Sequence, residues 1–279
     1  MSKHLYPCLW FNGNIAEATQ FYCSLFENAK VQAENAIITK FEIEGTTIKL
    51  LNGGALFSKN PSISLFVKCA TKDEIEKLWH AFMDGGKALM ALDTYPWSPL
   101  YAWVEDKYGM TWQLFLSALK EGEQKIIPNF LFTNTVFGRA EEALHFYKSI
   151  FKEAKLLSIE KYEEGDPSLQ GKLKFGSFEM LDAQFAIMDG PGNHAFEFNE
   201  AVSLVVECQD QLEVDYYWEQ LTHGGHEGEG QCGWLKDKFG VSWQILPVQL
   251  NALMGNPQTA EKARNAFMKM RKLIIKDLY

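Results

Sequence analysis

The stretch DKYGMTWQ at residues 106–113 returns as DKFGVSWQ at residues 237–244. Two further stretches repeat in the same order: AEATQFY (16–22) returns as EEALHFY (141–147), and SLFVKC (64–69) returns as SLVVEC (203–208). The spacing between the copies is 131, 125 and 139 residues for these three pairs, as expected when loops change length and structural elements persist. A repeat this long is a whole domain rather than a solenoid unit, so the sequence predicts a protein that is built twice.

The composition is typical of a globular protein without a membrane span. Of the 279 residues, 47% are hydrophobic and 23% are charged, and no apolar run approaches the roughly 20 residues that cross a bilayer. No secretory signal is visible at the start, which favours a cytoplasmic location. The net charge of −9 argues against nucleic acid as a partner. Five cysteines, with Cys69 and Cys208 at equivalent places in apolar strands, indicate reduced, buried thiols.

Each copy contains two units in which a strand and an amphipathic helix precede further strands. The predicted domains are residues 1–121 and 126–250, joined by a short polar linker. Residues 251–279 follow as a C-terminal helix and a possible added strand at 273–278. We expect the two domains to form a pseudo-dimer within the chain, and the whole chain can dimerise again.

The chain resembles the PhnB-like branch of the vicinal oxygen chelate superfamily, which also contains glyoxalase I, bleomycin-resistance proteins and extradiol dioxygenases. The stretches that carry the resemblance are PCLWFNGN (7–14), the Ala-Glu-Ala and Phe-Tyr pattern of the first helix, and CGWLKDKFG (232–240) before Trp243-Gln244. The resemblance implies an α+β fold of two tandem domains, each made of two βαβββ units that form a cupped mixed sheet with flanking helices. It also implies a small-molecule site in each cup.

Catalytic members of the superfamily hold a divalent metal on four residues at the first and last strands of the units. By motif alignment these places fall on or near Pro7, Lys49, Ser62 and Gln113 in the first domain, and on or near Pro128, Met188, Ala201 and Gln244 in the second. Imidazole nitrogens and carboxylate oxygens, the usual ligands, are missing from both sets. The sequence therefore predicts no metal and no other cofactor. His223 and His226 are interpreted as a helix end and turn, because a double glycine separates them.

The residues left in each cup are aromatic and amide-bearing. Neighbouring residues of a strand point to opposite faces, so in each Trp-Gln pair only one side chain enters the cup, and the superfamily geometry makes it the glutamine. A buried amide offers donors and an acceptor to a polar ligand, and tryptophan offers a stacking surface. We therefore predict Gln113, Gln244, Trp103 and Trp234 as ligand-binding residues. Asp106 and Asp237 are interpreted as turn formers.

The function predicted from these features is binding of a small, planar or aromatic molecule in the cups without a metal. The alternative is an enzyme of the same superfamily with a metal-free acid or base, for which Asp182, Asp189, His194 and Glu197 are the nearest candidates; no catalytic residue can be assigned. A third hypothesis is an interaction scaffold that uses the basic C-terminal segment. Related sequences are labelled demethylubiquinone methyltransferases, but the only dense glycine run, 224–233, leads into a strand and carries acidic residues, which disfavours a Rossmann-type methyltransferase.

Overall fold

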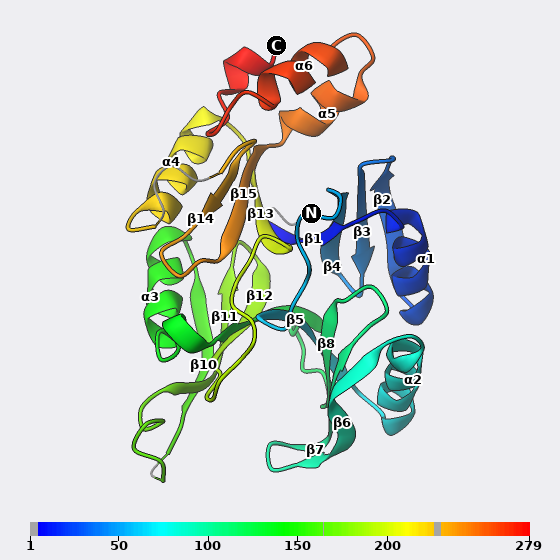
Figure 1. Cartoon of the computed structure of the whole chain (residues 1–279), viewed down its shortest axis with the longest axis vertical. Helices are drawn as coiled ribbons and strands as arrows, with labels where there is room; N and C mark the ends of the chain where they lie inside the picture. The colour runs from blue at the N-terminus through cyan, green and yellow to red at the C-terminus, as the bar shows by residue number, and fades with distance from the viewer. Residues whose placement is uncertain (1–4, 164, 226–229) are drawn as a thin grey trace.

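The computed structural model describes residues 5–163, 165–225 and 230–279, which fold into two mixed β-sheets with helices on their outer faces (Figure 1). The first half contains β1 (Leu5–Phe11), α1 (Ile15–Leu25), β2 (Ala29–Glu34), β3 (Ile38–Ile43), β4 (Thr46–Asn52), β5 (Ile63–Cys69), α2 (Lys72–Met83), β6 (Lys87–Tyr95), β7 (Ser98–Glu105) and β8 (Thr111–Leu116). The second half contains β9 (Ile126–Phe132), η1 (Asn134–Val136), α3 (Ala140–Ile150), β10 (Lys155–Lys161), β11 (Leu173–Met180), β12 (Ala183–Asp189), β13 (Val202–Cys208), α4 (Gln211–Thr222), β14 (Trp234–Lys236) and β15 (Ser242–Pro247). The predicted α+β class with two tandem halves is confirmed.

The structure also shows which units share a sheet, and the arrangement is crosswise. The first unit (β1–β4) and the fourth (β13–β15) form a seven-stranded sheet, in the order β14-β15-β13-β1-β4-β3-β2. The second unit (β5–β8) and the third (β9–β12) form an eight-stranded sheet, in the order β10-β11-β12-β9-β5-β8-β7-β6. The central strands pair antiparallel, with Cys8 opposite Ser203 in one sheet and Asn129 opposite Ser64 in the other. The seven-stranded sheet therefore takes four strands from the first half of the chain and three from the second, and the eight-stranded sheet takes four from each.

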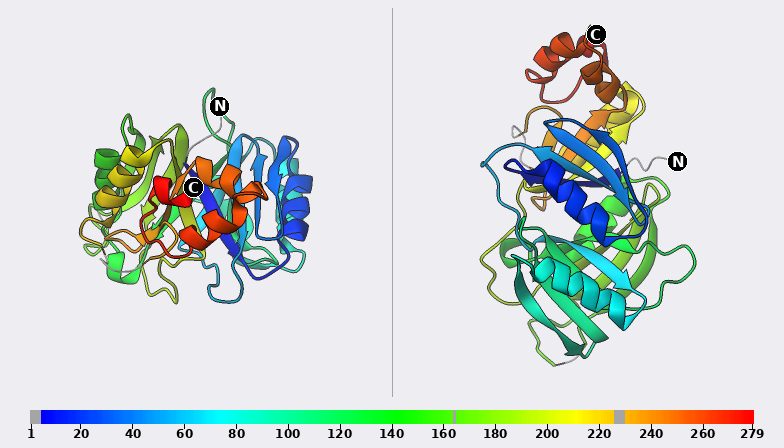
Figure 2. Two further views of the ribbon diagram at one scale, coloured as in Figure 1. Left: turned by 90° about the horizontal axis from the view of Figure 1, so that it is seen from above. Right: turned by 90° about the vertical axis from the view of Figure 1, so that its right-hand side faces the viewer.

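Helices α1 to α4 cover the outer faces of the two sheets (Figure 2). In α1 the buried residues Ile15, Ala18 and Tyr22 recur at helical spacing and lie on one side. Helix α2 begins with a capping box, in which the Thr71 hydroxyl accepts a hydrogen bond from the Glu74 amide, and the Glu74 carboxylate accepts one from the amide of Ala70. Asp210 and Glu213 repeat this arrangement at α4, so the duplicated acidic pattern fixes where both helices begin.

A buried aspartate joins the two sheets in each half of the molecule. One oxygen of Asp106, which follows β7, accepts hydrogen bonds from the Tyr22 hydroxyl of α1 and the Trp112 indole of β8, both at 2.8 Å. Its other oxygen accepts from the amides of Tyr108 and Met110, at 2.8 and 3.0 Å. Since α1 belongs to the seven-stranded sheet and β8 to the eight-stranded one, this carboxylate connects the two layers.

Asp237 makes the equivalent set of bonds in the second half. It accepts from the Tyr147 hydroxyl at 2.8 Å, from the Trp243 indole at 2.9 Å, and from the amides of Phe239 and Val241. The sequence correctly placed both aspartates in tight turns, but it missed that they are buried and that they bind a tyrosine of the preceding unit. The repeated Asp-Lys-aromatic-Gly-x-x-Trp motif is therefore a structural joint.

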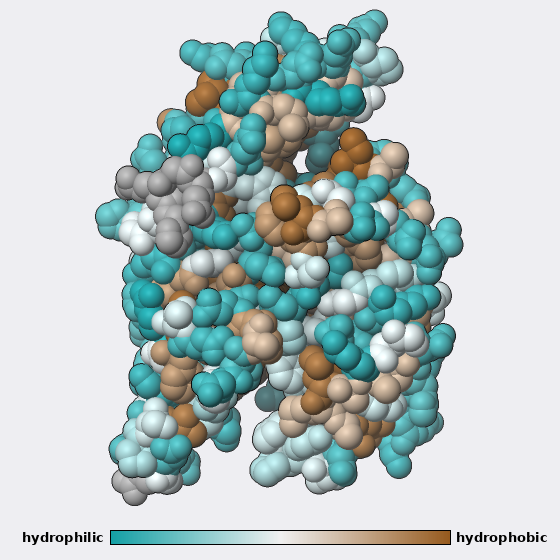
Figure 3. Space-filling view, viewed as in Figure 1, coloured by the Kyte–Doolittle hydropathy of each residue, from teal (hydrophilic) through white to brown (hydrophobic). Residues whose placement is uncertain are grey.

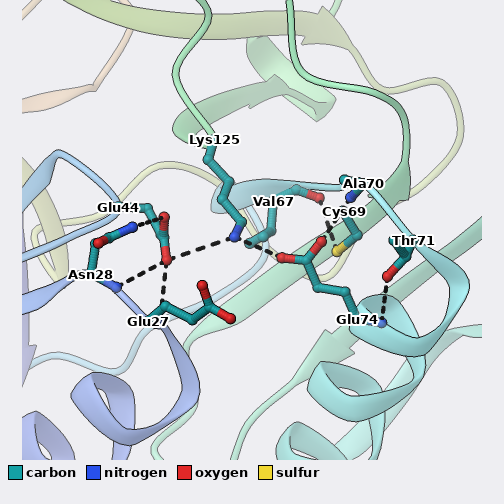
Figure 4. Close-up of polar contacts among 9 residues, drawn as sticks. All are labelled: Glu27, Asn28, Glu44, Val67, Cys69, Ala70, Thr71, Glu74 and Lys125. Atoms are coloured by element: carbon teal, nitrogen blue, oxygen red, sulfur yellow. Dashed lines mark hydrogen bonds and ion pairs between the residues drawn. The ribbon is translucent and has the colours of Figure 1, made fainter.

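The linker between the halves is held by Lys125 (Figure 4). Its ammonium lies 2.6 Å from a carboxylate oxygen of Glu74 in α2 and 3.7 Å from one of Glu44, in the turn between β3 and β4. Glu44 also accepts hydrogen bonds from the amides of Glu27 and Asn28. Burial acts to lower the pKa of Lys125, but the carboxylates of Glu74 and Glu44 outweigh it and raise this pKa. One cation thus connects the linker to the first two units.

The C-terminal segment packs on the inner face of the seven-stranded sheet, which is the face turned away from α1 and α4. It contains α5 (Gln249–Gly255), α6 (Ala260–Phe267) and η2 (Ile275–Leu278), so the possible added strand at 273–278 is wrong. Leu273 and Leu278 are fully buried in a cluster with Tyr6 and Val205, and this docking favours a compact turn over an extended edge strand. No helix among the described residues is both long and apolar enough to span a bilayer.

Removing the buried carboxylate should destabilise the fold strongly. In Asp237→Ala, four donors lose their acceptor, so we expect the free energy of unfolding to fall by about 3 kcal/mol or more. Urea denaturation at neutral pH measures this, and Asp106→Ala should behave alike. Glu219→Ala, on the exposed side of α4, serves as the control with no loss. Equal stability of Asp237→Ala and the control would contradict the structural joint.

The same carboxylate should make stability depend on pH. Burial raises the pKa of Asp237 to about 6, although its hydrogen bonds partly oppose this. The native state then binds a proton more tightly than the unfolded chain, whose aspartate pKa is about 4. The extra stability from binding this proton is therefore complete below that pH and is lost as pH rises through 6. From pH 4 to pH 7 we expect the free energy of unfolding of the wild type to fall by about 2 to 3 kcal/mol relative to that of Asp237→Asn. A difference that stays constant over this range would rule the effect out.

Candidate functional site

The inner faces of the two sheets carry equivalent rows of polar side chains. We call the inner face of the seven-stranded sheet cup A and that of the eight-stranded sheet cup B. Strand register defines one row across each cup, except at the step from glutamine to serine. There Gln244 pairs with Val205 and Gln113 with Phe66, and a side-chain hydrogen bond joins each glutamine to the serine two residues earlier on the same neighbouring strand. In cup A the row is Trp234, Gln244, Ser203, Cys8, Lys49 and Lys40. In cup B the row is Trp103, Gln113, Ser64, Asn129, Ala186 and Ser177.

Three positions of the rows carry the same residues in both cups, and three carry different residues. The Trp, Gln and Ser positions are the same in both cups, and they come from the fourth and second units. The other three positions come from the first and third units and differ in charge: Lys49 and Lys40 of cup A correspond to Ala186 and Ser177 of cup B. The two cups therefore share a polar half and differ in the half that could recognise a charged group.

Several positions assigned from the motif alignment are corrected by this register. Pro7 and Pro128 lie on the helix-covered face, and the inward residues are their neighbours Cys8 and Asn129, because a shift of one residue reverses the face. Ser203 and Ser64 replace Ala201 and Ser62 in the rows. Ala186, and not Met188, is the equivalent of Lys49. Gln113 also lies in a different sheet from Lys49, since the units pair crosswise.

A cavity of about 270 Å³ lies in cup A between the sheet and the C-terminal helix α5. Its polar lining includes Tyr6, Lys40, Lys49 and Glu207 from the strands. Its apolar lining includes Ile38, Leu246, Leu250 and Met254. Ligand sites in proteins combine mainly apolar walls with a few placed polar groups, and this cavity has that character. The sequence did not predict it, because α5 closes it from a distant part of the chain.

Lys49 is the unusual member of this lining. Only 9% of the residue is exposed, and among the described residues its ammonium has no hydrogen-bond acceptor or ion-pair partner. Its neighbour Lys40, in contrast, lies 2.8 Å from a carboxylate oxygen of Glu207, and the Tyr6 hydroxyl donates to the same oxygen at 2.5 Å. A lysine is rarely buried without a partner, so Lys49 is available to a ligand anion.

The centre of cup A holds a thiol that is protected from reaction. Burial raises the pKa of Cys8, although the charge of Lys49 and hydrogen bonds with Gln244 and Ser203 act in the opposite direction. Nucleophilic cysteines need a lowered pKa and access to solvent. Cys8 has neither, so it forms part of the packed floor of the cup.

The four predicted ligand-binding residues all lie on inner faces. Gln244 is buried and donates to the Ser203 hydroxyl at 2.9 Å, and Gln113 donates to the Ser64 hydroxyl at 2.6 Å. Trp234 and Trp103 lie opposite these glutamines in the strand pairing. Gln244 and Trp234 are not among the described residues that line the cup A cavity, so their contact with a ligand stays a prediction.

In the described part of the chain, no hydrogen bond or ion pair joins any two of the alternative acid and base candidates. Asp182 lies in the exposed turn before β12, whereas Asp189 ends that strand, so the two are separated by its length. Asp189 is buried and accepts hydrogen bonds from the amides of Gly138, Ala140 and Leu173, which is a role in holding α3. Both remaining candidates lie in the loop after β12. His194 contacts the Pro191 carbonyl and Glu197 contacts Thr135.

The donor sets of the rows do not fit a divalent metal. In cup A a lysine ammonium takes one of the four places, and in cup B an alanine does, while the other positions offer a thiol, hydroxyls and amides. Among the described residues, no group of three or more His, Cys, Asp or Glu side chains is arranged to hold a metal. His223 is the C-cap of α4, as expected for a helix end, and His226 lies outside the described residues.

A family model described as 3-demethylubiquinone-9 3-methyltransferase matches the chain twice, over residues 3–115 and 124–246. The chain belongs to this family. The two matches cover both halves, so the chain is a tandem member, as the resemblance implied.

Two solved structures are similar to this chain. A putative 3-demethylubiquinone-9 3-methyltransferase, PhnB protein, from Bacillus cereus is 32% identical over 40% of this chain and 98% of its own, with a TM-score of 0.39. Glyoxalase I from Zea mays is 12% identical over 88% of this chain and 94% of its own, with a TM-score of 0.53, which shows a shared fold. No curated protein matches the chain in sequence.

The unpaired state of Lys49 predicts the effect of two substitutions. Lys49→Met replaces the unpaired ammonium of a largely buried residue with an apolar chain of similar length, so the free energy of unfolding should stay level or rise by about 1 kcal/mol. Lys40→Met, the matched variant, removes the cationic partner Lys40 from Glu207, which keeps Tyr6, and should lower the free energy of unfolding by about 1 to 3 kcal/mol. Urea denaturation of both variants tests this. Greater destabilisation by Lys49→Met than by Lys40→Met would show that Lys49 is held by a partner.

Proposed function

We propose that this PhnB-like protein binds a small organic anion, without a metal, in the cavity of cup A. The observation that carries the proposal is Lys49, a nearly buried and unpaired cation on the wall of a cavity. A buried charge without a partner is costly, and a ligand carboxylate would remove that cost. Binding energy would then come from an interaction that the protein alone lacks.

The rest of the lining supports a ligand with one anionic end and an apolar body. Leu246, Leu250 and Met254 offer an apolar wall opposite the strands, and the Tyr6 ring offers an aromatic surface. The Glu207 carboxylate, which Tyr6 and Lys40 hold in place, is a negative group in the lining. It would therefore repel a second negative group on the ligand. The volume of about 270 Å³ is near the lower limit for ligand sites. These features favour a planar aromatic monocarboxylate.

The turn between the first strand and the first helix gives no support for the methyltransferase activity in the family description. A methyltransferase of the Rossmann type binds its donor at a glycine-rich turn between a first strand and a helix. Here the turn from β1 to α1 is Asn12-Gly13-Asn14, and Asn14 caps α1 without a side-chain hydrogen bond. The metal-free acid or base alternative gains no support either, because no hydrogen bond or ion pair among the described residues joins two of its four candidates.

Calorimetric titration with benzoate, phenylacetate and indole-3-acetate tests the proposal. At least one of these acids should bind the wild type saturably, and Lys49→Met should weaken it by about tenfold to a hundredfold, the usual worth of a charge-assisted hydrogen bond. Lys152→Met, on the exposed loop after α3, is the control and should bind like the wild type. The proposal fails if none of the acids binds the wild type, or if Lys49→Met retains full affinity.

A further inference from the structure

We infer that cup B is a second binding site, for a neutral planar molecule that presents a hydrogen-bond donor beside an acceptor, as a lactam, imide or primary amide does. The inference rests on Asn129 and its surroundings and does not depend on the anion site of cup A. It assigns the two cups to ligands of different chemical class.

Asn129 lies in the middle of cup B on β9. It is fully buried, and among the described residues neither its amide oxygen nor its amide nitrogen has a hydrogen-bond partner. Its antiparallel neighbour Ser64 already accepts a hydrogen bond from Gln113, whose own oxygen accepts from the Tyr101 hydroxyl at 2.5 Å. Buried side-chain amides nearly always have partners, so both atoms of this one point to a molecule that supplies them.

Two more groups on the same face share this property. The Trp103 indole nitrogen and the Thr111 hydroxyl are buried without a partner in the described part of the chain. Trp103 lies directly opposite Gln113, and Thr111 is two residues before it on the same face of β8. Unpaired donors and acceptors therefore collect on the inner face of one sheet.

The charge of the row decides the ligand class. Where cup A has Lys49 and Lys40, cup B has Ala186 and Ser177. A carboxylate placed beside Asn129 would meet no cation of this row, whereas an amide edge could accept from the Asn129 nitrogen and donate to its oxygen at once. Such pairing rejects molecules that lack the matching groups, because the buried amide then stays unpaired.

Aromatic side chains give cup B walls that suit a flat molecule. Phe66 of β5 and Phe175 of β11 meet across the cup at 6.1 Å between ring centroids, although β9 and β12 separate their strands in the sheet. Both rings, and Trp103, are only partly buried, whereas Asn129 beneath them is fully buried. Figure 3 shows the surface hollowed between the ends of the β10–β11 and β6–β7 hairpins.

Titration with the neutral probes 2-pyridone, uracil and benzamide tests the inference. At least one probe should bind the wild type saturably, and Asn129→Leu should weaken it at least tenfold. Lys49→Met should bind that probe with wild-type affinity. A variant that loses only benzoate binding is altered in cup A, and a variant that loses only binding of the neutral probe is altered in cup B. Failure of all three probes, or equal affinity in Asn129→Leu, overturns the inference.

A stability measurement without any probe gives an independent check. If the Asn129 amide is unpaired in the protein, Asn129→Leu replaces it with an apolar group of similar size, and the Tm should stay level or rise by about 2 to 4 °C. Asn129→Asp is the companion variant and should lower the Tm, since it buries a charge in the same place. A marked fall in the Tm of Asn129→Leu would show that Asn129 already has its partners and would overturn the inference.

Discussion

The structure depends on a carboxylate that is buried between its two sheets in each half of the molecule. Burial of Asp106 and Asp237 raises their pKa, and each is compensated by a tyrosine, a tryptophan and two backbone amides. Because the carboxylate binds the indole of Trp112 or Trp243 on the helix-covered side, strand alternation turns the next residue, Gln113 or Gln244, toward the inner face. The joint that connects the sheets therefore also sets the orientation of the cup floors.

Duplication gave the two cups a common framework, and divergence changed one side of it. The Trp-Gln-Ser part is retained in both, whereas the part from the first and third units is cationic in cup A and neutral in cup B. The C-terminal segment adds a second asymmetry, because α5 closes only cup A. The two cups therefore differ in charge and in closure, which is the basis for proposing different ligands for them.

Much of the fold could be predicted from the sequence, since the repeats, the helix patterns and the Trp-Gln alternation are local signals. The crosswise pairing could not, because it depends on which strand edges meet after folding. The inward residues Cys8 and Asn129 were missed by one position, although an asparagine inside the apolar run IIPNFLF was a usable signal. Lys49 was identified but judged only as a metal ligand, and its value as an unpaired cation became apparent once the cavity beneath α5 was known.

The crosswise sheets also affect how the chain can be made. The strand β1, near the start, pairs with β13, whose partner residues lie almost two hundred positions later. A ribosome that has released only the first half exposes β1 and β5 with open edges, and neither sheet can be completed until the second half follows. Pairings of such long range fold slowly and leave strands vulnerable to aggregation in the meantime. The nascent chain therefore has a long period in which protection by chaperones matters.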